Sequence, residues 1–80
     1  MKQESMEFYW MVGNRIRDIR IYERIRVESL AHACGISTKH LYQIENGKVA
    51  FSTEILFQIA NKLQVSADVL LGLAQQEERW

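Results

Sequence analysis

Apolar residues recur every three or four positions along most of this 80-residue chain, which is the spacing of one face of an α-helix. No stretch alternates between apolar and polar residues for long enough to form a β-strand. The pattern therefore predicts an all-α fold, a compact bundle of five short helices. These helices are expected at residues 12–22, 27–34, 38–46, 53–63 and 67–71.

Serine and glycine mark the predicted helix boundaries. A serine side chain can accept a hydrogen bond from a free N–H at a helix start, and glycine readily adopts the left-handed conformation that ends many helices. Three serines stand just before predicted helices, namely Ser37, Ser52 and Ser66. Three glycines stand just after predicted helices, namely Gly35, Gly47 and Gly72.

The helices divide the chain into an N-terminal arm (1–11), a helical domain (12–72) and a C-terminal tail (73–80). The arm carries the aromatic run "FYW" at residues 8–10. Ile21 lies on the outward side of the first predicted helix, and we expect the arm to fold back and cover it. The alternative is an exposed apolar patch that mediates self-association.

The predicted helix at 38–46 has two different faces. On a helical wheel, Leu41 and Ile44 point to one side. The opposite side carries a cation, a phenol and two amides, contributed by Lys39, Tyr42, Gln43 and Asn46. Such groups hydrogen-bond base edges and phosphates, although a polar helix face can also simply meet water. A short helix, a turn with glycine and then this helix indicate a helix-turn-helix unit.

The run "LAHACGISTKHLYQIENGK" resembles the helix-turn-helix core of the phage-repressor and Cro-like (XRE) family of transcriptional regulators. The resemblance rests on one set of positions, namely Leu30, Ala31, Gly35, Leu41, Ile44, Glu45 and Gly47. With the flanking helices it extends over about residues 12–72. It implies a lambda-repressor-like DNA-binding domain whose third helix lies in the major groove.

The resemblance also implies a set of DNA contacts. The expected base contacts are Thr38, Lys39, Tyr42 and Gln43. The expected contacts to the DNA backbone are Asn46, Lys48 and His32.

Two charged residues fall on the inner sides of predicted helices. Arg20 lies beside the apolar stripe of the first helix, and Glu45 lies on the inner side of the third. Because an unpaired buried charge is costly, we predict an Arg20–Glu45 ion pair, which the resemblance also implies. The alternative is that both side chains extend to water.

The chain departs from the family pattern at three positions. Arg26 stands where the family usually has a serine or threonine cap for the second helix. Arg24 and Gln64 replace frequent glycines in two turns, so each is expected to be strained if its φ is positive.

Charge and cysteine content narrow the expected function. The net charge is zero, but residues 13–48 contain seven Lys or Arg and four Asp or Glu, or +3. Cys34 is the single cysteine, which excludes an intramolecular disulfide and fits a reducing cytoplasm. Its spacing from His32 and His40 does not favour a shared metal ion, so we expect no metal or cofactor. No apolar run is long enough to span a membrane, and no secretion signal is evident.

These features predict a cytoplasmic transcriptional regulator, most simply a repressor, that binds double-stranded DNA as a homodimer. With no second domain in view, we expect no small-molecule effector. One alternative is the antitoxin of a toxin–antitoxin pair, and another is a protein-interaction module that has lost DNA binding. No catalytic constellation is visible, so an enzyme is not expected.

Overall fold

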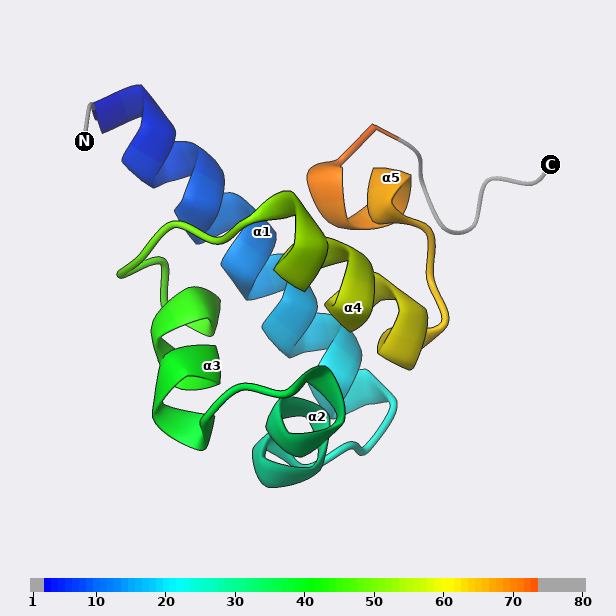
Figure 1. The fold of residues 1–80 in the computed structure, drawn as a ribbon. Helices are drawn as coiled ribbons and strands as arrows, with labels where there is room; N and C mark the ends of the chain where they lie inside the picture. Colours follow the sequence, from blue (N-terminus) through cyan, green and yellow to red (C-terminus); the bar gives the residue numbers. More distant parts are fainter. Residues whose placement is uncertain (1–2, 74–80) are drawn as a thin grey trace, which may run out of the picture.

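The computed structural model describes the backbone of residues 3–73 and the side chains of residues 6–73. This part of the chain contains five helices. They are α1 (Gln3–Tyr22), α2 (Val27–Cys34), α3 (Thr38–Glu45), α4 (Thr53–Leu63) and α5 (Ala67–Leu71). α1 runs diagonally through the molecule and contacts α3, α4 and α5, while α2 packs between α3 and α4 (Figure 1). The predicted all-α fold is confirmed.

The serine caps lie at the predicted helix starts. In each case the serine Oγ accepts a backbone N–H three residues ahead: Ser37 from His40 at 3.0 Å, Ser52 from Ile55 at 3.1 Å and Ser66 from Val69 at 3.3 Å. α2 differs, because the side chain of its N-cap residue Arg26 makes no capping hydrogen bond. The first turn of α2 therefore lacks the side-chain cap that the other three helix starts have.

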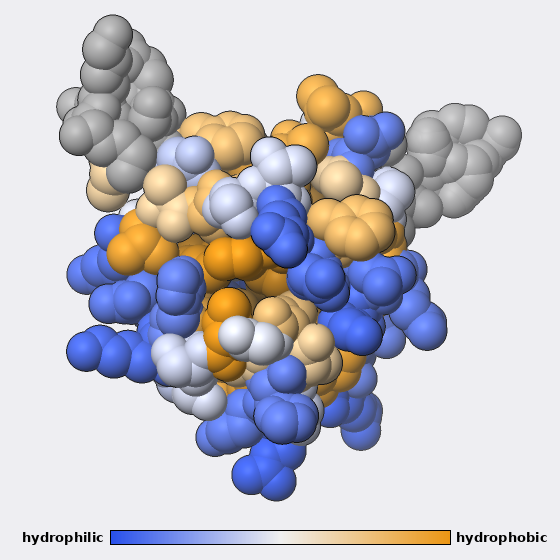
Figure 2. Space-filling view, viewed as in Figure 1, coloured by the Kyte–Doolittle hydropathy of each residue, from blue (hydrophilic) through white to orange (hydrophobic). Residues whose placement is uncertain are grey.

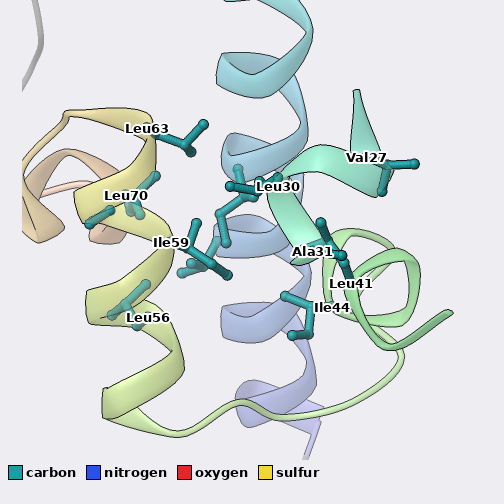
Figure 3. Close-up of a cluster of buried hydrophobic side chains, with 12 residues drawn as sticks. Val27, Leu30, Ala31, Leu41, Ile44, Leu56, Ile59, Leu63 and Leu70 are labelled. Carbon is teal, nitrogen blue, oxygen red and sulfur yellow. The ribbon is translucent and has the colours of Figure 1, made fainter. Parts of the chain in front are cut away.

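The core is a single apolar cluster to which all five helices contribute (Figure 3). Burial of each large aliphatic side chain is worth about 1.5–3 kcal/mol relative to exposure. The most deeply buried are Ile16, Leu30, Leu41, Ile44, Ile59 and Leu70. The inward apolar stripes predicted from periodicity are thus the ones that form the core.

The N-terminal arm does not fold back onto Ile21. Residues 3–11 continue α1 as a helix, and Ile21 at its other end remains 57% exposed. The aromatic run instead packs on the α3–α4 loop, where the ring of Tyr9 meets Phe51 edge-to-face at 4.7 Å. Because no proline interrupts residues 3–11, the backbone hydrogen bonds of α1 continue and carry these aromatics away from Ile21. The boundary at residue 11 therefore falls within one helix, and the tail beyond Leu73 lies outside the described residues.

None of the helices in the described part of the chain combines the length and the apolar character needed to cross a membrane.

Two turns adopt the left-handed conformation without glycine. Arg24 has φ 60° and Gln64, the C-cap of α4, has φ 61°. The Cβ atom makes this conformation costly, by roughly 1–2 kcal/mol for an L-residue. The positive φ on which the expected strain depended is therefore found at both positions.

Replacing Gln64 by glycine should stabilise the domain. The gain should be about 0.5–1 kcal/mol in the free energy of unfolding, because relief of the left-handed strain exceeds the added entropy of glycine in the unfolded chain. Urea unfolding measures this gain. Gln58→Gly, within α4, is the matched control and should destabilise by about 1 kcal/mol. A loss of stability in Gln64→Gly would contradict the prediction.

Candidate nucleic-acid interface

Helix α3 is held against α1 by a close approach of their backbones. A Cβ atom added to Gly13 of α1 would lie 2.0 Å from the carbonyl oxygen of Ile44 and 3.1 Å from that of Glu45. Any side chain at position 13 would therefore push the two helices apart. Glycine fixes the distance at which the C-terminal turn of α3 crosses α1.

A buried ion pair is the second contact that fixes α3 against α1. Arg20 Nε donates to Glu45 Oε2 at 2.7 Å, and Arg20 Nη2 donates to Glu45 Oε1 at 3.1 Å. The third guanidinium nitrogen, Nη1, donates to the carbonyl oxygen of Ile25 at 2.9 Å. The side chains are 12% and 1% exposed for Arg20 and Glu45, so the pair lies within the fold. The structure thus contains the pair predicted from the sequence, with α1, α3 and the turn before α2 joined through one guanidinium.

The electrostatics favour the charged form of this arginine. The hydrogen bond that Arg20 donates to Glu45 raises the pKa of Arg20 above its ordinary value, although burial acts in the opposite direction. The guanidinium therefore remains charged, and its two parallel hydrogen bonds to Glu45 set the rotation of α3 as well as its distance from α1.

The opposite face of α3 is polar and open. Figure 2 shows polar side chains along the outer edge of the molecule on which α3 lies, while apolar side chains gather nearer the middle of this view. These polar residues line a groove of about 500 Å³. The lining consists of Thr38, Lys39, Tyr42, Gln43, Asn46 and Lys48.

The groove brings together six of the seven side chains proposed to contact DNA. Lys39, Tyr42, Asn46 and Lys48 are exposed, while Thr38 and Gln43 are half-buried. The seventh, His32, is exposed in the last turn of α2 and does not line the groove. The exposed side chains among them are available to a partner without rearrangement of the fold.

Cys34 is a packing residue. It lies against the apolar core, and burial raises the pKa of its thiol while the charge of Lys62 lowers it less. The thiol is therefore neutral at physiological pH. Across the described residues no three His, Cys, Asp or Glu side chains gather as metal ligands would.

The structure also places beside the groove one residue that sequence reasoning had not assigned to the site. Trp10 of α1 packs on Gly47, which lies between Asn46 and Lys48. Helical periodicity relates only residues near one another in sequence, so it could not pair positions 10 and 47. The one signal in the sequence was the absence of a helix breaker between residues 3 and 12, which allows α1 to extend as far as Trp10.

Comparisons with known proteins agree with this geometry. The helix-turn-helix family model HTH_3 matches residues 16–70, which include all of the helix-turn-helix unit. The chain therefore belongs to the HTH_3 helix-turn-helix family, the XRE-type family that its sequence resembles.

Among curated proteins, the chain is similar to an uncharacterised HTH-type transcriptional regulator found in two strains of Mycobacterium tuberculosis. The identity is 40% over 58 residues, or 72% of this chain, in both strains. The match covers 41% of the relative, so the chain spans about two fifths of its length.

Solved structures share the fold. The DNA-binding domain of the P22 C2 repressor is 31% identical, with a TM-score of 0.74 over 86% of this chain and 93% of that one. The clp gene regulator ClgR from Corynebacterium glutamicum has a TM-score of 0.80 at 24% identity, over 82% of this chain and 70% of that one. The five-helix arrangement is thus the repressor-like helix-turn-helix fold.

Removing the carboxylate of Glu45 should destabilise the domain strongly. Glu45→Ala leaves Arg20 buried without its partner, which costs about 3–5 kcal/mol in comparable sites. Thermal or urea unfolding measures the loss. Glu28→Ala is the control, because Glu28 faces Arg26 at 3.8 Å on the surface and such pairs contribute little. Equal stability of the two variants would show that the buried pair does not hold α3.

Proposed function

We propose that this chain is the sequence-specific DNA-binding domain of a transcriptional regulator, and that it represses transcription by inserting α3 into the major groove of duplex DNA. The observation that carries the proposal is the groove lined by six polar residues of α3 and of the turn that follows it. The pair of Arg20 and Glu45 fixes α3 on its other side. Membership of the helix-turn-helix family supports it.

The groove offers the chemistry needed to read base edges. The amide of Gln43 can form two hydrogen bonds with adenine, and the ammonium group of Lys39 can donate to the acceptors of guanine. Thr38, in the first turn of α3, can bond a base edge through its hydroxyl. Tyr42 adds an aromatic ring for a thymine methyl group or a hydroxyl for a phosphate. These four side chains are the proposed base contacts.

Three further residues are proposed to hold the sugar–phosphate backbone. Asn46 and Lys48 follow α3 at one end of the groove, and His32 lies on α2. Contacts of this kind fix the position of the protein on DNA without reading sequence. The local excess of positive charge supports binding, whereas the net charge of zero limits the affinity of a single copy.

We further propose a homodimer in the cytoplasm. A second copy would let the protein read two half-sites about one helical turn, or roughly 34–36 Å, apart. By analogy with the family, the contact would lie near α5 and the C-terminal end of the domain. No catalytic activity is proposed.

Selection of bound sequences from a random duplex library tests this function. The wild-type protein should enrich a paired motif at low salt, because each protomer reads one half-site. Lys39→Ala and Gln43→Ala should blur particular positions of that motif, each at a cost of about 1–3 kcal/mol in discrimination. Lys62→Ala, an exposed lysine of α4, is the control and should leave the motif intact.

Three outcomes would contradict parts of this proposal. Binding without an enriched motif would indicate a nonspecific DNA-binding protein. No binding at low salt would indicate a protein-interaction module, and co-purification with a tight protein partner would favour an antitoxin.

Lys48→Ala should weaken binding to all duplexes alike. If Lys48 neutralises one phosphate, its removal should reduce the slope of log K against log salt concentration by about 0.9. Titrations of fluorescent duplex at several salt concentrations measure the slope, with Lys62→Ala again as the matched lysine control. A slope equal to that of the wild type would remove Lys48 from the interface.

A further inference from the structure

Trp10 lies where α1 meets the end of α3. A Cβ atom added to Gly47 would lie 2.6 Å from Trp10 Cα, 2.8 Å from its Cβ and 3.0 Å from its Cδ1. The tryptophan is therefore in direct contact with the peptide that joins Asn46 to Lys48, the two residues proposed to hold the DNA backbone. Gly47 permits this approach because it has no side chain and has φ 70°.

The indole remains largely exposed despite this contact. Trp10 is 57% exposed, whereas its neighbour Tyr9 is half-buried against Phe51. Phe8 also approaches Phe51, with ring centroids 6.5 Å apart. These two neighbours anchor the N-terminal turns of α1 on the α3–α4 loop, as Figure 1 shows for the two segments. The exposed part of the Trp10 indole is thus a large apolar surface that does not take part in packing α1 on the α3–α4 loop.

We propose that Trp10 contacts the sugar–phosphate backbone of the bound duplex, beside Asn46 and Lys48. This inference rests on the proposed function and extends its interface onto α1. The indole offers an apolar face for a deoxyribose ring and an Nε1–H donor for a phosphate oxygen. Tryptophan carries no charge, so its contact adds affinity without releasing a counterion.

Neighbouring groups on α1 define the extent of this contact. Asn14 Nδ2 donates to the carbonyl oxygen of Trp10 at 2.7 Å, and Arg17 in turn donates to the side-chain oxygen of Asn14. Toward the N-terminus, Glu7 is exposed one turn before Trp10, and its carboxylate is repelled by phosphates. The contact of the DNA backbone with α1 is therefore expected to include Trp10 and to exclude Glu7.

The test uses the fluorescence of Trp10 in a Trp80→Phe background, where Trp10 is the remaining tryptophan. A mixed-sequence duplex at low salt, and any duplex enriched by selection, are titrated into this protein. Binding should change the emission of Trp10 and reduce its quenching by acrylamide at least twofold. A residue that only supports the fold would show no such protection.

Affinity measurements on substituted proteins complete the test. Trp10→Ala should weaken binding to both duplexes by about threefold to tenfold, as expected for loss of one contact, with an unchanged salt slope. Trp10→Phe keeps the packing on Gly47 and should lose less. Tyr22→Ala removes a still more exposed aromatic residue, 85% against 57% for Trp10, from the opposite end of α1 and should bind as the wild type. Thermal melts check that each variant is folded.

The outcomes separate this inference from the proposed function. If the Trp80→Phe protein binds DNA but Trp10 is neither protected nor required, the contact at Trp10 is wrong and the proposed function stands. If neither that protein nor the wild type binds any duplex, both are wrong.

Discussion

The attachment of α3 to α1 is the constraint on which the rest of this structure depends. The eight residues of α3 bury only Leu41, Ile44 and Glu45, which is little apolar surface for a helix that must keep a fixed orientation. Two additional contacts supply that orientation: the backbone approach at Gly13 and the bidentate pair of Arg20 with Glu45. Because both lie on the inner side of α3, its outer side is left open for the proposed contacts with DNA.

A buried ion pair contributes to geometry more than to net stability. Desolvation of two charges offsets much of their attraction, so an apolar replacement of similar size can give an equally stable protein. Apolar contacts, however, have no preferred direction. The guanidinium of Arg20 presents its donors in a fixed plane and reaches Glu45 and the carbonyl of Ile25 at once, which sets the rotation of α3 relative to α1.

The distribution of charge explains how a protein of zero net charge can serve as a DNA-binding domain. Basic residues outnumber acidic ones over residues 13–48, the part of the chain that contains α2 and α3. The weak overall field favours a small number of directed contacts over general attraction to phosphates. In the proposed complex, Trp10 would enlarge the contact area without adding charge, which suits an interface that has few cations.

Local sequence determined the five helices, the serine caps and the outward face of α3. Each depends on residues within a few positions of one another. The Arg20–Glu45 pair was also predictable, since each charge lay on or beside the inner side of its helix and the family resemblance implied the pair. The absence of a helix breaker lets residues 3–11 continue α1, but the place where their aromatic side chains pack was decided by tertiary structure, because Tyr9 contacts the distant Phe51. The same holds for Trp10 at Gly47, where the α3–α4 loop and the N-terminal turns of α1 meet only after the core has formed.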